Sequence, residues 1–134
     1  MTAEHRRENV RLEVEKSRRT RTTADRTAGD GDYDAAVNRL YYAAFHAARA
    51  VCLTGGLEAK SHRGLKHLLA LHFVHAGLLP DWAQTVLSRL ETERDLADYA
   101  LGEATSREGF ELRREETDRF LAEVEGFLSK GGWI

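Results

Sequence analysis

Two short stretches of the sequence carry the side chains best suited to bind an anion or to move a proton. The first is Asn38–His46, where an amide, a guanidinium, two phenols and an imidazole lie close together. With about 100° between successive residues, one helix face collects Asn38, Tyr41, Tyr42, Phe45 and Arg49, and an adjoining face collects Arg39, Tyr42 and His46. Buried polar groups need partners, so these side chains form either a structural polar network between helices or the lining of a cleft or dimer interface.

The second stretch is Glu93–Tyr99. Arg94 and Asp98 lie four residues apart, a spacing that suits an ion pair on a helix surface. Because Leu90 and Leu101 flank the stretch, part of it is expected to point inward. An inward arginine needs an anion, which Asp98 or the phosphate of a ligand would supply.

The histidines in the middle of the chain do not predict a metal site. Of His62, His67, His72 and His75, only the last two share a helix face closely, and no cysteine or well-spaced carboxylate joins them. The sequence also lacks a Ser–His–Asp or Cys–His motif and a glycine-rich phosphate loop. We therefore expect no metal and no other cofactor.

Helical segments must position these stretches. Apolar residues spaced by three and four predict five helices, at about residues 3–28, 33–53, 62–77, 80–101 and 106–129. Asp32 and Ser61 are suited to cap the second and third of them. No segment alternates with the period of two that is typical of strands. Short loops between long amphipathic helices predict an all-α fold, an up-and-down antiparallel helical bundle that residues 1–134 form as a single domain.

The composition agrees with such a fold. Hydrophobic residues make up 42% of the chain and charged residues 31%, which is typical of a globular protein. Cys52 is the single cysteine, so an internal disulfide is excluded, and we expect it to be a small core residue. The N-terminal residues are charged, without an apolar signal core, and no apolar run reaches the length of a membrane span. These features predict a cytoplasmic protein that has no contact with a membrane.

Charge is distributed unevenly along the chain. The formal net charge is −2, so the molecule as a whole does not attract nucleic acid. The tract Lys16–Arg21 is nevertheless basic, and Arg26 follows it. It is either a solvated helix face or a surface that contacts phosphates or a partner.

Three segments together resemble the HEPN domain family. Residues 33–46, YDAAVNRLYYAAFH, resemble the family segment dysAvnRxYYAxFhaa. Residues 61–65, SHRGL, resemble the segment sHxGl, and residues 94–99, RDLADY, resemble RxxADY. Their order and spacing also fit, and the likeness covers roughly residues 10–128. The branch that this sequence resembles most is that of the small stand-alone HEPN proteins.

The resemblance implies a helical bundle that usually dimerises. Many HEPN proteins are metal-independent ribonucleases that act as toxins or defence effectors, often encoded beside a minimal nucleotidyltransferase that serves as the antitoxin. In their motif, an arginine and a polar residue precede a histidine, and two copies of the motif meet across the dimer. The arginine stabilises phosphate charge, and the histidine handles the proton as the RNA 2′-hydroxyl attacks phosphorus.

On this sequence the motif arginine corresponds to Arg94 and the polar residue to Asp95, while Tyr99 stands where active families carry histidine. A phenol is a poor general base at neutral pH. Arg39 and His46 offer a second Arg–His pairing, although in a different helix from the family motif. The candidate binding residues are Asn38, Tyr41, Tyr42, His62 and Asp98. Some antitoxins of this type add AMP to a tyrosine near the catalytic histidine, which makes Tyr99 a candidate acceptor by proximity.

The sequence leaves three hypotheses open. In the first, the protein belongs to a toxin–antitoxin or defence module and cleaves RNA, as a homodimer that joins the second and fourth helices. In the second, it is a non-catalytic HEPN module that binds a nucleotidyltransferase partner or a nucleotide. In the third, it is an unrelated helical dimerisation domain.

Overall fold

The computed structural model describes all residues from 1 to 134 and contains helices only, which confirms the predicted fold class. Five α-helices follow one another, and a single π-helical turn extends the third. Their bounds are α1 Ala3–Gly29, α2 Tyr33–Thr54, α3 His62–Leu69, the π turn Ala70–Val74, α4 Asp81–Tyr99 and α5 Arg107–Lys130.

The N-terminal ends of the helices carry the expected caps. Asp32 Oδ1 accepts a hydrogen bond from the Ala35 amide at 3.1 Å, and Ser61 Oγ accepts one from the Gly64 amide at 2.9 Å. Each cap satisfies a first-turn N–H group that has no partner inside the helix. Both predicted caps are therefore confirmed, and they determine where α2 and α3 begin.

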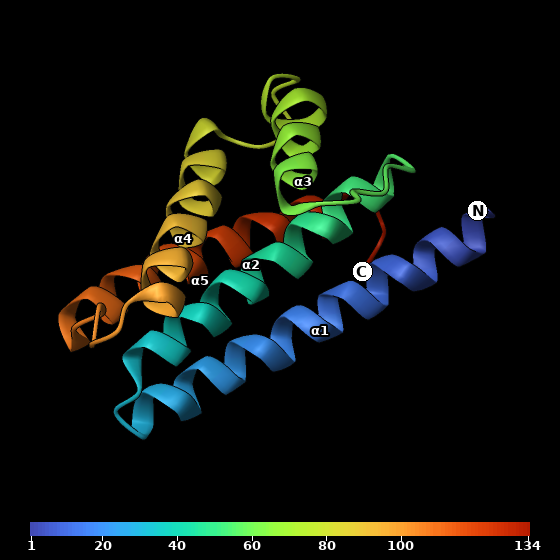
Figure 1. The fold of residues 1–134 in the computed structure, drawn as a ribbon. Coiled ribbons are helices and arrows are strands. Elements are labelled where there is room, and N and C mark those ends of the chain that lie inside the picture. Colours follow the sequence, from blue (N-terminus) through green and yellow to red (C-terminus); the bar gives the residue numbers. More distant parts are fainter.

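α2 is the central helix of the bundle. α1 and α2 lie side by side and antiparallel, α5 runs behind α2, and the α3–α4 pair stands across them at an angle (Figure 1). α2 packs against all four other helices. Small side chains allow this close approach, because six of the twelve buried residues of α2 are alanines. Side chains on α2 can thus reach all four of these neighbours.

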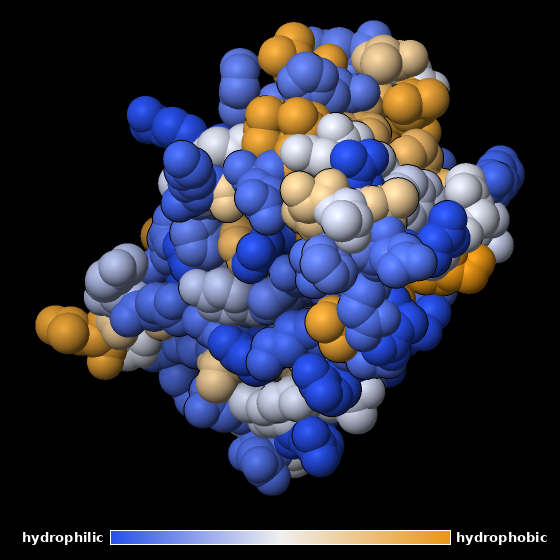
Figure 2. Space-filling view, turned by 90° about the vertical axis from the view of Figure 1, so that its right-hand side faces the viewer, coloured by the Kyte–Doolittle hydropathy of each residue, from blue (hydrophilic) through white to orange (hydrophobic).

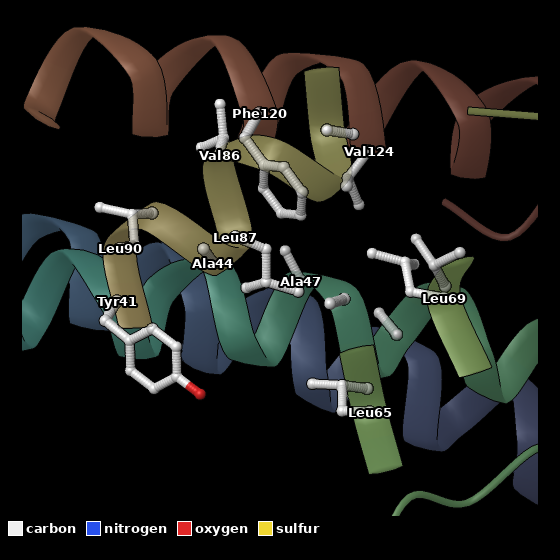
Figure 3. Close-up of a cluster of buried hydrophobic side chains, with 14 of the residues drawn as sticks. Tyr41, Ala44, Ala47, Leu65, Leu69, Val86, Leu87, Leu90, Phe120 and Val124 are labelled. Atoms are coloured by element: carbon white, nitrogen blue, oxygen red, sulfur yellow. The ribbon is translucent and has the colours of Figure 1, made fainter. Parts of the chain in front are cut away.

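The hydrophobic core fills the space between α2, α4 and α5. Phe120 of α5 points toward Ala44 and Ala47 of α2, and Val86 and Leu87 of α4 lie beside it (Figure 3). Phe120 is 0% exposed. Tyr41 belongs to the same core through its ring, while its hydroxyl points out of the apolar cluster (Figure 3). The core therefore determines the position of one candidate site residue directly.

The third helix and several leucines differ from prediction. The α-helical part of the third helix ends at Leu69, and the His75 amide then donates to the Ala70 carbonyl at 2.8 Å, five residues back. The wider turn allows Phe73 and Val74, which are adjacent, both to be buried. Leu101, which was expected to turn the end of the fourth helix inward, is exposed, and so are Leu71, Leu96 and Leu112.

The outer surface is mostly hydrophilic on the face shown in Figure 2. More apolar residues gather toward the top of that view, where Figure 1 places α3 and the segment after it. Leu71 and Leu78, both about half exposed, belong to this part of the chain. None of the helices combines the length and the apolar character that crossing a bilayer requires.

Cys52 is 1% exposed, as expected for a small core residue, and burial raises the pKa of its thiol from 9.0 to about 12. As the pH rises, the thiol therefore loses its proton in the unfolded chain before it does so in the folded chain. The free energy of unfolding has its full value below pH 9 and falls above pH 9. Between pH 8 and pH 10.5 we expect the thiol to remove about 2 kcal/mol from the free energy of unfolding. Urea denaturation of the wild type and of Cys52→Ala measures this, and an equal alkaline loss in both proteins would contradict it.

Candidate functional site

The candidate site lies along a strip of α2 that no other helix covers completely. Asn38, Arg39, Tyr42, Phe45 and His46 are all half-buried there. Their partners come from α4 at one end of the strip, from α3 in the middle and from α1 at the other end. The two stretches identified in the sequence meet at the α4 end.

Arg94 of α4 is held against two tyrosine rings of α2. Its Cζ lies 4.8 Å from the centroid of the Tyr41 ring and 5.7 Å from that of Tyr42. Nη1 donates to the Tyr42 hydroxyl at 3.0 Å, and Nε donates to Asp95 Oδ1 at 3.1 Å. Burial lowers the pKa of Arg94, but the hydrogen bond and the charge of Asp95 outweigh it and raise the pKa above its ordinary value. The result is a fixed, permanently charged guanidinium.

Arg39 approaches the same tyrosine from α2 itself. Its Cζ lies 5.2 Å from the centroid of the Tyr42 ring, and its Nη2 and Nε donate to Asn38 Oδ1 at 2.6 and 3.0 Å. Two guanidinium groups thus converge on one aromatic ring. We call Arg39, Arg94 and Tyr42 the arginine cluster. Guanidinium groups that lie against the same ring favour a phosphate or another oxyanion as a ligand.

Asn38 links the cluster to the last turn of α4. Its Nδ2 donates to both carboxylate oxygens of Asp98, at 3.2 and 3.3 Å. The ion pair between Arg94 and Asp98 that the spacing suggested does not form, because Arg94 turns toward Asp95 and the α2 rings instead. Asp98 therefore fixes Asn38, which in turn orients Arg39.

His62 is the imidazole that the fold brings to this end of the site. Its Nδ1 lies 2.5 Å from the Tyr41 hydroxyl, which also lies 3.4 Å from Glu91 Oε2. Glu91 in turn forms an ion pair with Lys66 at 3.2 Å. Burial raises the pKa of Tyr41 above its ordinary value, and the negative charge of Glu91 raises it further. Tyr41 therefore stays protonated and can donate to or accept from His62.

His46 lies at the opposite end of the strip. Its Nδ1 pairs with Glu13 Oε2 of α1 at 2.7 Å, and Arg49 shares the other oxygen of that carboxylate at 3.5 Å. Arg39 and His46 share a helix face, as the sequence indicated, but His46 pairs with α1, whereas Arg39 contacts Asn38 and Tyr42 of α2 itself. The hydrogen-bonding capacity of His46 Nδ1 is thus taken up by the Glu13 carboxylate of α1.

Tyr99 ends α4 and is 84% exposed. Leu96 and Leu101 beside it are also exposed, at 58% and 108%. The prediction that Leu101 turns this stretch inward is wrong, because α4 stops at Tyr99 and the chain leaves the bundle there, whereas Leu90 is fully buried as expected. An exposed phenol and two leucines therefore form the outer end of α4.

Carboxylates of α5 pair with two of the four cations in the basic tract of α1. Arg18 pairs with Glu125 at 2.9 Å, and Arg21 pairs with Asp118 at 2.6 Å. Ser17 of the same tract is buried and donates to the Ala43 carbonyl of α2 at 2.7 Å. The tract therefore holds helices together, with only part of its charge left to face solvent.

Sequence reasoning missed Glu91 and Lys66. Glu91 lies three residues before Arg94, so the helical period places both on neighbouring positions of one face, and this signal could have identified it. Lys66 follows His62 by four residues in the same way. No three His, Cys, Asp or Glu side chains of the structure are grouped so that they could hold a metal ion.

Comparison with known proteins identifies the family. The model described as the HEPN domain matches residues 10–131. A protein named "Putative toxin" from Methanocaldococcus jannaschii is 32% identical over 98 residues, which span 73% of this chain and 67% of that relative. A second protein so named, from the same organism, is 28% identical over 130 residues, 97% of this chain and 83% of the relative. A UPF0332 protein from Gloeobacter violaceus is 40% identical over 72 residues, 54% and 57% of the two chains. The resemblance seen in the sequence is therefore confirmed, and this chain belongs to the HEPN domain family.

Proposed function

We propose that this protein is the toxin-type member of a toxin–antitoxin or defence module and cleaves RNA without a metal. The observation that carries the proposal is the convergence of Arg39 and Arg94 on Tyr42. Two fixed guanidinium groups stabilise the negative charge that grows on a phosphate as the neighbouring 2′-hydroxyl attacks it. Kinship to two proteins named "Putative toxin" supports the same assignment.

The phosphate has a defined place in this proposal. It displaces Asp95, whose side chain is 47% exposed, from Arg94, and it takes its second contact from Arg39. Tyr42 remains behind both guanidinium groups and keeps them in position. Because their geometry is fixed before RNA arrives, little reorganisation is needed when the charge develops.

His62 is the group that we assign to proton transfer in place of Tyr99. Its Nδ1 faces the Tyr41 hydroxyl, and its Nε2 makes no hydrogen bond. When the hydroxyl donates to Glu91, Nδ1 carries the ring proton and Nε2 is free to accept the 2′-hydroxyl proton. Once Nε2 has taken that proton the ring is an imidazolium, and Nε2 can then give the proton to the leaving 5′-oxygen, which returns the ring to its neutral form. The exposed Tyr99 has no such hydrogen-bond partner.

The proposal includes a homodimer that joins α2 and α4 and brings two arginine clusters together. The exposed Leu96, Tyr99 and Leu101 supply apolar surface at the end of α4 where such an interface would form. Asp34 holds the loop after α4 in place, since its carboxylate accepts from the Thr105 amide at 2.8 Å. The loop at the edge of the proposed interface is therefore held in place against α2.

A labelled single-stranded RNA incubated with the purified protein and excess chelator tests the proposed activity. We expect the wild type to cleave the RNA in the absence of any metal. His62→Ala should lower the rate about 100-fold. The matched control is His67→Ala, since His67 is an exposed histidine of the same helix. RNA that stays intact at every pH, together with harmless expression in cells, would exclude the ribonuclease.

A second candidate function is a non-catalytic module that docks a nucleotidyltransferase. The specific observation in its favour is Tyr99, which offers an exposed hydroxyl at the end of a helix and stands where the active families carry histidine. Such a protein would bind its partner through the end of α4. In the experiment above it would leave RNA intact, whereas Tyr99→Ala would abolish binding of the partner.

A further inference from the structure

A shallow depression lies beside the arginine cluster, where α2 faces the start of α3. It has a volume of about 190 Å³ and is lined by Phe45, Arg49, Ala59, Lys60, Ser61 and His62. We propose that this depression receives one unpaired base of an RNA strand whose neighbouring phosphate is held by the arginine cluster. The inference rests on the proposed function and names its substrate class, single-stranded RNA.

Aromatic rings form the wall of the depression. The ring centroid of Phe45 lies 4.7 Å from that of His62, at an interplanar angle of 33°. On its other side the Phe45 ring meets Tyr42 edge-on at 5.8 Å. Because Phe45 is only half-buried, part of its ring is available to a ligand. Every base has a flat π-face, so such rings bind bases with little dependence on sequence.

A single tyrosine connects the depression to the arginine cluster, an arrangement that suits the base and the phosphate of one nucleotide. Tyr42 touches the depression through Phe45 and the cluster through Arg39 and Arg94, whose Cζ atoms lie 5.2 and 5.7 Å from its ring centroid. One tyrosine ring thus separates the proposed base position from the proposed phosphate position. In a nucleotide, a single sugar likewise links the base to its phosphate.

Positive charge continues on the far side of the depression. The Cζ of Arg49 lies 5.7 Å from the Phe45 ring centroid, its side chain is 40% exposed, and Lys60 is also exposed. Arg39 and Arg49 are ten residues apart on α2, or about 15 Å along the helix axis. Phosphates repeat about every 3.4 Å along a stacked strand, so this length spans a few nucleotides. Cations at both ends and rings between them are the arrangement found in single-strand binding grooves.

An unpaired base is required by this arrangement. The depression is partly open to solvent and is lined by Phe45, His62 and residues 59–61. A base that enters it would pack against these residues by its face or edge. A base that is paired in a duplex is stacked on both sides and cannot enter without leaving its helix. The inference therefore predicts a preference for single strands over duplex RNA.

Fluorescence anisotropy with a labelled RNA pentamer tests the inference, using an intact strand and a set of strands that each lack one base. For the wild type, we expect removal of one particular base to weaken binding about tenfold, whereas removal of the others has little effect. Phe45→Ala should weaken binding of the intact strand about tenfold and leave the strand that lacks the critical base unchanged. Phe45→Trp should restore the difference, because it restores a ring.

Phe45→Leu serves as the matched variant, because it keeps an apolar side chain of similar bulk and removes only the ring. It should bind like Phe45→Ala while its thermal unfolding stays close to that of the wild type. If the wild type binds every strand equally well, or if the Phe45 variants weaken all strands alike, the base position is wrong although RNA binding stands. If the wild type binds no RNA, the proposed function itself fails, and the inference fails with it.

Discussion

Replacing Arg94 by alanine is expected to lower the rate of RNA cleavage by about 100-fold or more. The substitution removes the guanidinium that the Tyr41 and Tyr42 rings hold in place, and it leaves Arg39 as the only cation of the cluster. Arg94→Lys should recover only a small part of the rate, because an ammonium cannot contact a phosphate with two parallel hydrogen bonds. Single-turnover cleavage of a labelled RNA measures both variants.

Arg21→Ala is the matched control for Arg94→Ala. The two side chains are similarly buried, 13% and 17% exposed, and each contacts a carboxylate, but Arg21 lies between α1 and α5, remote from the cluster. We expect Arg21→Ala to lower thermal stability without changing the cleavage rate per folded molecule. If both substitutions reduced cleavage equally, Arg94 would act only through stability, and the role of the cluster in catalysis would be refuted.

The substitution Phe120→Ala should destabilise the fold more than any change at the site, by about 3–5 kcal/mol. Phe120 is 0% exposed and points from α5 toward the alanines of α2, which are too small to fill the space that its ring would leave (Figure 3). The cost therefore combines the lost transfer of the ring from water with the cavity that remains. Urea denaturation monitored by circular dichroism measures the difference in the free energy of unfolding.

Leu112→Ala provides the comparison on the same helix. Leu112 lies two turns before Phe120 and is 55% exposed, so its removal should change the free energy of unfolding by less than about 0.5 kcal/mol. A loss of stability at Leu112 as large as that at Phe120 would show that this face of α5 is covered in solution. A loss below about 1 kcal/mol at Phe120 would show that the core repacks around the missing ring.

The sequence predicted the helices well because their signals are local. Asp32 and Ser61 cap their helices by accepting hydrogen bonds from the amides three residues later, so they mark where the helices begin. The spacing of apolar residues along α2 identifies its buried face. The convergence of the two stretches near Tyr42 was also predictable, because both combine inward apolar residues with groups that need partners. Short-range rules thus sufficed for the architecture and for the contact between the two stretches.

The pairings inside the site could not be predicted in the same way. Spacing alone suggested an ion pair between Arg94 and Asp98. In the structure Asp98 accepts a hydrogen bond from Asn38, and Arg94 forms its ion pair with Asp95. His46 pairs with Glu13, thirty-three positions earlier in the sequence. Such choices depend on how helices that are distant in sequence are rotated against each other. They also depend on which carboxylate lies nearest to each cation in the folded chain. These pairings are therefore determined by tertiary packing rather than by local sequence spacing.

The double position of Tyr41 has a consequence for how this lineage can change. The ring is 1% exposed within the core, while the hydroxyl meets His62. Natural selection for a folded chain alone is therefore enough to preserve this tyrosine, even in a descendant that has lost all activity. Arg39 and Arg94 have no comparable place in the apolar interior, so drift would erase them first. Among related sequences, substitution of both arginines while the tyrosine is kept should therefore identify an inactive descendant.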